Sequence, residues 1–158
     1  MKLYLVQHGE AKSESEDPQR SLTGRGMDEV QNVAKMAKKL NLCPSKIYHS
    51  GKLRAKQTGE IFADSLKRPA ESAQGLNPND DVRVWADQLS AEKEDLMIVG
   101  HLPFLEKLAS LLITGNENIR PVLFHYGAIV SLEKKEGSGG GVRWILTPEM
   151  AIPPPPLS

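Results

Sequence analysis

The two histidines best placed to do chemistry each follow a short apolar run. His8 comes after residues 3–6, and His101 comes after residues 96–100. A third polar cluster, around Arg54, follows the short β-favouring stretch 46–50. Ligands of open α/β sheets bind beyond the carboxyl ends of the strands, so these three groups are expected to meet in one crevice. Two imidazoles and a guanidinium suit an anion, most naturally phosphate, because arginine offers a planar fork of donors and histidine can be a nucleophile.

Helical spacing of apolar residues predicts the elements that position these groups. The pattern predicts an amphipathic helix over residues 26–40, with Thr23 placed to cap its first amides. A second helix is expected over residues 52–66, after the Ser50-Gly51 break. Arg54 would then lie in the first turn of a helix, where backbone N–H groups already favour an anion.

A third helix is expected to open with Pro103 in its first turn and to end near Thr114-Gly115. A weaker pattern predicts a short helix over residues 82–89. The polar residues 67–79, which include two prolines and a glycine, are interpreted as a loop over the sheet.

Two β-favouring segments near the C-terminus predict an antiparallel hairpin. Residues 128–132 and 142–146 read as strands, and the glycine-rich residues 137–141 would join them. The proline run over residues 153–156 cannot enter a helix or a sheet, so an extended, exposed tail is expected there.

The order of these elements predicts the fold class. Three strand–helix units followed by a hairpin are typical of an α/β protein, here a three-layer α/β/α sandwich with a mainly parallel central sheet and an antiparallel hairpin near the C-terminus. A chain of 158 residues is most simply one domain. We assign residues 1–150 to that domain and residues 151–158 to a Pro-rich C-terminal tail.

Composition argues against several functional classes. Lys and Arg number 20, as do Asp and Glu, so the overall field gives no broad attraction to nucleic acid or to a membrane. Cys43 is the only cysteine, which excludes an intrachain disulfide and suits a reducing cytoplasm. The first apolar run is too short for a signal peptide, and no segment approaches the ~20 apolar residues that span a bilayer. We therefore expect a soluble, cytoplasmic protein.

The histidines do not show the spacing of a metal site. The four of them, His8, His49, His101 and His125, never stand four residues apart or in another compact ligand pattern. We expect no metal, and a site built wholly from side chains implies no organic cofactor.

Four short motifs occur in order along the first two thirds of the chain. They are Gln7-His8-Gly9-Glu10, Leu22-Thr23 followed by Gly26, Ser50 to Thr58 with Arg54-Ala55 within it, and Gly100-His101. Together they resemble the motifs of the histidine phosphatase superfamily, which includes the phosphoglycerate mutases. The short length and the segments around Arg20 and Pro103 are most similar to the small bacterial phosphohistidine phosphatases of the SixA type.

This resemblance implies a role for each matched residue. His8 would be the nucleophile that becomes a phosphohistidine intermediate, and Arg54 and His101 would bind the transferring phosphoryl oxygens. Inorganic phosphate or a similar anion would occupy the pocket. Further phosphate-binding contacts are expected from Gln7, Arg20 and Gly9.

The departure that matters is Gln7, which stands where the resembling family has the first arginine of Arg-His-Gly-Glu. A neutral hydrogen bond in place of a charged one weakens phosphate binding by on the order of 1 kcal/mol. Lys12 or Lys52 could supply charge from a loop. An inactive phosphate-binding or interaction module is therefore one alternative reading of the chain.

The expected substrate depends on whether a general acid is present. Larger phosphomonoesterases of this superfamily use a Glu or Asp to protonate an alkoxide leaving group, and Asp80 and Asp81 are the candidates here, although a solvated turn explains that pair better. Phosphohistidine needs an acid less, because its P–N bond is labile. We therefore expect hydrolysis of phosphohistidine on a partner protein, such as a phosphotransfer domain or phosphocarrier. A small-molecule phosphomonoesterase or mutase is the other alternative.

Overall fold

One six-stranded sheet runs through the centre of the molecule, in the order β3-β2-β4-β1-β5-β6. The computed structural model describes residues 1–135, 139–153 and 155–157. The strands from β3 to β1 are parallel, and β5 and β6 are antiparallel to their neighbours. The strands are β1 (Lys2–Gln7), β2 (Lys46–His49), β3 (Ala70–Ser72), β4 (Leu96–Gly100), β5 (Ile129–Lys134) and β6 (Gly140–Leu146).

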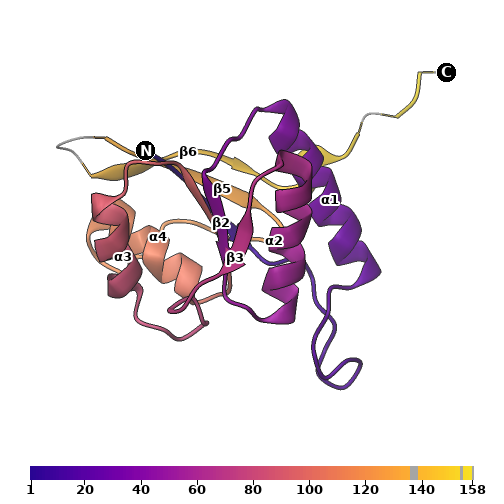
Figure 1. Cartoon of the computed structure of the whole chain (residues 1–158), viewed down its shortest axis with the longest axis horizontal. Coiled ribbons are helices and arrows are strands. Elements are labelled where there is room, and N and C mark those ends of the chain that lie inside the picture. Colours follow the sequence, from indigo (N-terminus) through magenta and orange to yellow (C-terminus); the bar gives the residue numbers. More distant parts are fainter. Residues whose placement is uncertain (136–138, 154, 158) are drawn as a thin grey trace.

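Helices cover both faces of the sheet, as Figure 1 shows, with α1 and α2 on one side and α3 and α4 on the other. The expected three-layer α/β/α sandwich is therefore confirmed. None of the described helices is long and apolar enough to cross a membrane. The helices are α1 (Gly24–Lys39), α2 (Leu53–Leu66), α3 (Val82–Ala91) and α4 (Phe104–Thr114), followed by a 3-10 turn, η1 (Pro148–Ala151).

The central strands are apolar on both faces because each face packs against a helical layer. In β1, Leu3 and Leu5 belong to the core under α3 and α4, whereas Tyr4 and Val6 belong to the core under α1 and α2. This alternation is the two-residue period of a strand. The buried β1 and β4 pair in parallel, so the residues that follow them emerge side by side.

Several predicted boundaries differ from the structure. The segment expected to be a loop, residues 67–79, contains β3, which pairs with β2 through Ile47 and Ala70. Pro103 stands just before α4, at its N-cap, rather than inside the first turn. The short helix is confirmed and extends to Ala91.

The C-terminal hairpin is confirmed, with both strands longer than expected. Of the glycine-rich residues expected to join them, 137 and 138 lie outside the described residues, as does Pro154 of the expected tail. Pro153 and Pro155 are exposed and form no regular element. Ala151, however, is buried in the core that α1 covers, so ordered packing reaches slightly past residue 150.

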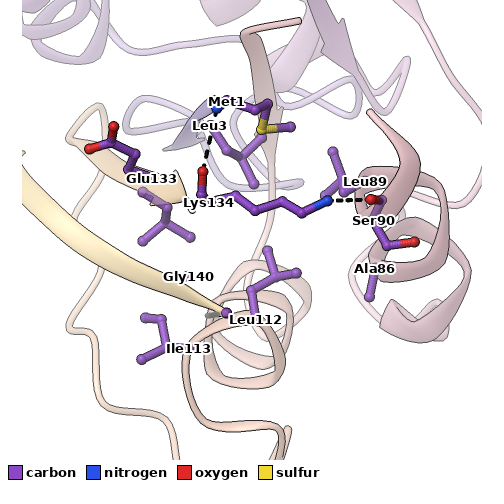
Figure 2. Close-up of a pocket in the computed structure, with 12 residues that line it drawn as sticks. Met1, Leu3, Ala86, Leu89, Ser90, Leu112, Ile113, Glu133, Lys134 and Gly140 are labelled. Carbon is purple, nitrogen blue, oxygen red and sulfur yellow. Dashed lines mark hydrogen bonds between the residues drawn. The ribbon is translucent and has the colours of Figure 1, made fainter. Parts of the chain in front are cut away.

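An apolar pocket opens at the end of the sheet where strand β1 begins (Figure 2). Met1 and Leu3 line it together with Leu89 of α3 and Leu112 of α4. The Lys134 ammonium donates to the Ser90 carbonyl beside it. His8 follows the C-terminal end of β1, so this pocket and the predicted site lie at opposite ends of that strand.

Candidate active site

The two histidines stand side by side because β1 and β4 end at the same level. Gln7 is paired with Gly100, and the His8 amide donates to the Gly100 carbonyl at 3.0 Å. The His8 and His101 ring centroids are 5.1 Å apart. Both side chains are buried, with His8 only 6% exposed and His101 only 2% exposed.

The His8 ring is held in one tautomer. Its Nδ1 atom lies 2.7 Å from the carbonyl oxygen of Gly9. A carbonyl can only accept, so Nδ1 carries the hydrogen and Nε2 keeps a free lone pair. Burial is the main cause that lowers the pKa of His8 to about 4; the Gly9 hydrogen bond opposes this shift, and the Arg54 and Arg20 charges add to it. The imidazole is therefore neutral at pH 7, as a nucleophile must be.

Two guanidinium groups bring positive charge to the histidines. Arg54 is the second residue of α2, and burial followed by the nearby Arg20 charge lowers the pKa of its side chain. Arg20 has a left-handed backbone, and its Nε donates to the Lys12 carbonyl at 3.0 Å. Both charges lower the pKa of His8 and of His101. The structure therefore gathers four of the predicted residues, His8, Arg20, Arg54 and His101, in one electropositive cluster.

His101 is fixed by the loop that follows β2. Its Nε2 atom lies 2.6 Å from the Ser50 hydroxyl. Burial lowers the pKa of His101 to about 3, and the positive field of His8, Arg54, Lys52 and Arg20 adds to that effect. This second imidazole is also neutral at pH 7.

Three buried side-chain atoms lack a hydrogen-bond partner in the described part of the chain, and all three belong to this cluster. They are Gln7 Oε1, Arg54 Nε and His101 Nδ1. Buried polar atoms normally have partners, so such a concentration indicates a site built for a polar ligand. The two ends of an amide exchange places by rotation, so Gln7 can turn either its oxygen or its NH₂ group toward that ligand.

Comparison with known proteins identifies the family. Residues 3–80 match the histidine phosphatase superfamily (branch 1). Phosphohistidine phosphatase SixA of Escherichia coli (strain K12) is 30% identical over 155 residues, which cover 94% of each chain. The chain belongs to the histidine phosphatase superfamily.

Two further matches cover most of the chain. An uncharacterized protein of Picosynechococcus sp. is 33% identical over 123 residues, or 73% of this chain and 74% of the relative. The solved structure of the protein histidine phosphatase SixA complexed with tungstate superposes with a TM-score of 0.83 at 30% identity. It covers 94% of this chain and 97% of the other.

Hydrogen bonds through Thr58 hold the loop that contains His8. The Gly9 amide donates to the Thr58 hydroxyl at 3.0 Å, and that hydroxyl donates to the Arg54 carbonyl at 2.8 Å. A Cβ on Gly9 would lie 2.7 Å from a methyl of Val30, closer than real Cβ contacts come. Gly9 was expected to bind phosphate; in the structure its amide donates to Thr58 and its carbonyl accepts from the His8 ring, so both of its backbone polar groups have partners within the protein.

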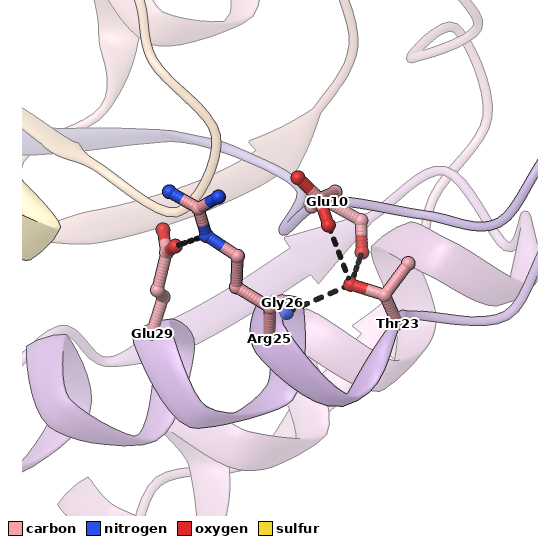
Figure 3. Close-up of polar contacts among 5 residues, drawn as sticks. All are labelled: Glu10, Thr23, Arg25, Gly26 and Glu29. Atoms are coloured by element: carbon pink, nitrogen blue, oxygen red, sulfur yellow. Dashed lines mark hydrogen bonds and ion pairs between the residues drawn. The ribbon is translucent and has the colours of Figure 1, made fainter.

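Thr23 joins the start of α1 to the same loop, as Figure 3 shows. The Thr23 hydroxyl accepts the Gly26 amide at 2.9 Å and donates to the Glu10 carboxylate at 2.9 Å. This confirms Thr23 as the cap of α1. A Cβ on Gly26 would lie 2.2 Å from the Glu10 carbonyl oxygen, so only glycine fits there.

The predicted acid candidates have local structural roles. Asp81 caps α3 by accepting the Arg83 amide, and Asp80 accepts the Asn77 amide at 2.9 Å. Neither carboxylate is among the groups that shift the pKa of His8 or His101. The described residues also contain no cluster of three His, Cys, Asp or Glu side chains that could hold a metal ion.

Sequence reasoning missed Tyr126, whose ring centroid lies 5.5 Å from that of His8. This half-exposed residue precedes Gly127, whose amide donates to the Gln7 carbonyl at 2.9 Å. The pairing of β5 with β1 could have placed Tyr126 near His8. Because β5 pairs antiparallel with β1, the residues that precede β5 must lie beside the end of β1.

Proposed function

We propose that this chain hydrolyses phosphohistidine on a partner protein through a covalent phosphohistidine intermediate on His8. The observation that carries the proposal is the neutral, buried His8 ring, with its Nε2 lone pair free beside Arg54 and His101. The relative named as a phosphohistidine phosphatase supports this substrate class, and the related structure with bound tungstate supports a tetrahedral anion in the pocket.

The reaction would proceed by two in-line transfers. The His8 Nε2 lone pair attacks phosphorus while the P–N bond to the partner's imidazole breaks, and that imidazole takes up a proton from solvent. Water then attacks the phosphorus on His8, which releases inorganic phosphate and restores the neutral ring. Arg54, Arg20 and His101 would donate to the equatorial oxygens, where charge is greatest in the transition state.

The surroundings of the histidines favour phosphohistidine over a phosphate monoester. An alkoxide leaving group needs a proton donor, whereas an imidazole leaving group can be protonated from solvent. No carboxylate is among the groups that shift the pKa of His8 or His101. Asp81 instead caps α3, and Asp80 accepts the Asn77 amide in the preceding turn.

The partner would be a phosphohistidine-bearing protein of the phosphotransfer-domain or phosphocarrier class. The chain carries no net charge, so recognition would depend on local contacts around the pocket mouth, where Tyr126 is 45% exposed. We place this reaction in the cytoplasm, where the free thiol of Cys43 would stay reduced.

A trapping experiment tests the proposal. Phosphohistidine proteins carrying radiolabelled phosphate are mixed with the enzyme and quenched rapidly in base, which preserves phosphohistidine. We expect transient label on His8 in the wild type and in His125→Gln, which alters an exposed histidine, but none in His8→Asn. Absence of label, together with hydrolysis that survives in His8→Asn, would sink the proposal.

The same preparation separates the two alternatives. Turnover of sugar or nucleotide phosphates that is lost in Asp80→Ala or Asp81→Ala would instead indicate a small-molecule phosphomonoesterase or mutase. Phosphate binding measured by calorimetry, without label on His8 and without turnover of any donor, would indicate an inactive module that Gln7 has disabled.

A further inference from the structure

We propose that Ser50 is a positioning residue that sets the tautomer of His101, so that the His101 Nδ1–H faces the phosphoryl group as a hydrogen-bond donor. This inference deepens the proposed function, on which its activity test rests, by naming the atom that meets the transferring oxygens. The observation behind it is a short relay in which the Lys52 amide, the Ser50 hydroxyl and the His101 ring follow one another.

The direction of this relay follows from its members. The Lys52 amide lies 3.3 Å from the Ser50 oxygen and can only donate to it. The Ser50 hydroxyl hydrogen is then directed to the His101 Nε2 atom, 2.6 Å away, as its one acceptor among the described residues. A neutral imidazole that accepts at Nε2 must carry its hydrogen on Nδ1.

The reverse arrangement leaves the hydrogen bonds less well satisfied. If Nε2 donated, Ser50 would accept twice and its own hydrogen would have no protein acceptor among the described residues. The buried Nδ1 atom would then present a lone pair to the pocket. A phosphoryl oxygen is itself an acceptor, so that lone pair would repel the group that the site must bind.

The tautomer of His101 decides which ring nitrogen can donate, because burial and the surrounding charges keep this ring neutral. Burial together with four neighbouring basic groups keeps His101 from taking a second proton, so it has a single N–H to offer. The Nδ1 atom is fully buried and lacks a partner in the described part of the chain. Its hydrogen therefore has no acceptor among the described residues, and a ligand bound against the His8 and His101 rings, whose centroids are 5.1 Å apart, would supply one.

The two imidazoles would then share one tautomer and use it in opposite ways. His8 directs its Nδ1–H to the Gly9 carbonyl and presents a bare Nε2 to phosphorus. His101 directs its bare Nε2 to Ser50 and presents its Nδ1–H to a phosphoryl oxygen. One ring becomes a nucleophile and the other a donor because each has a different fixed partner.

Nitrogen NMR tests the tautomer directly. Protein labelled with ¹⁵N-histidine is recorded at pH 7, free and with saturating inorganic phosphate, and long-range proton–nitrogen correlations identify the protonated nitrogen of His101. We expect the Nδ1–H form in the wild type and in Ser50→Thr. In Ser50→Ala we expect a mixture of forms. An Nε2–H form in the wild type overturns the inference, whatever the enzyme does to phosphohistidine.

Kinetics on the same variants provide the second measurement. We expect Ser50→Ala to lower kcat/KM for phosphohistidine hydrolysis by about tenfold, the effect of one lost hydrogen bond, and Ser50→Thr to restore most of it. The matched control is Ser65→Ala, which removes a hydroxyl of α2 that bonds to the Ala34 carbonyl, outside the pocket. Equal rates in Ser50→Ala and wild type would overturn the inference while leaving the role of His8 intact.

Discussion

His8 and His101 face each other across the candidate site with ring centroids 5.1 Å apart and ring planes inclined at 53°. Burial and two arginines hold both rings in their neutral forms. Neutral imidazoles beside two arginines can accept the charge of a phosphoryl group while the nucleophile stays unprotonated. The predictions below follow from this arrangement and from the contacts that support it.

The pKa values of His8 and His101 should lie far below the value of about 6.5 for an ordinary histidine. We expect midpoints of about 4 for His8 and about 3 for His101 in the free protein, measured from the ring Cε1–H proton shifts during a pH titration. Removal of one nearby charge in Arg20→Gln should raise the His8 midpoint. A midpoint near 6.5 for both rings would contradict the burial argument.

The same shifts predict how stability depends on pH. The folded-state pKa values lie below the unfolded value of about 6.5, so the unfolded chain binds more protons in this range. The free energy of unfolding should therefore fall as pH decreases from about 6.5, until about pH 4 for His8 and about pH 3 for His101, by up to about 1.4 kcal/mol per pH unit for each ring. Urea denaturation across this range should give a shallower slope for His8→Gln. An unchanged slope would count against the prediction.

Replacing Gln7 with arginine should strengthen the site. Gln7→Arg would turn a neutral donor into a charged one beside the phosphoryl group, worth about 1 kcal/mol or about fivefold in kcat/KM. Affinity for inorganic phosphate, measured by calorimetry, should rise in parallel. Gln7→Met keeps the length of the side chain but removes its polar end, so it should lower both kcat/KM and the affinity for phosphate. Weaker phosphate binding by Gln7→Arg would mean that position 7 does not reach the anion.

The two glycines at the start of α1 should respond very differently to a methyl group. Gly26→Ala places a Cβ against the Glu10 carbonyl and should lower the free energy of unfolding by about 3 kcal/mol. Gly24→Ala is the matched control, because a Cβ there meets nothing within 4 Å. That change should be neutral or slightly stabilising, since alanine restricts the unfolded chain. Equal urea midpoints for the two variants would refute the steric argument.

The predictable parts of the fold are the helices and strands in which apolar residues recur at a regular spacing. Three strand–helix units and the hairpin follow from apolar spacing, and Thr23 was recognisable as a cap from its type and place. The strand β3 was not, because Ala70–Ser72 is short and mostly exposed, and only its pairing with β2 makes it a strand. Tertiary context of this kind overrides local propensity.

Within the site, what could be predicted was the identity of the residues, and what could not was their partners. The short apolar or β-favouring runs that precede His8, Arg54 and His101 predict that these residues meet beyond the carboxyl ends of the strands. The Gly9 carbonyl as partner of the His8 ring required the actual turn of the chain. Tyr126 carries no motif and reaches His8 only because β5 runs beside β1.

The Thr58 hydroxyl links the position of the nucleophile to that of helix α2. It accepts the Gly9 amide and donates to the Arg54 carbonyl, so the turn that holds the nucleophile is bonded to the first turn of α2. The Gly9 amide hydrogen can exchange with solvent only when that bond breaks, and its exchange rate therefore reports separation of the His8 turn from the Thr58 side chain. His8 and Arg54 would lose their alignment in the same event, because both are tied to the Thr58 hydroxyl through the Gly9 amide and the Arg54 carbonyl.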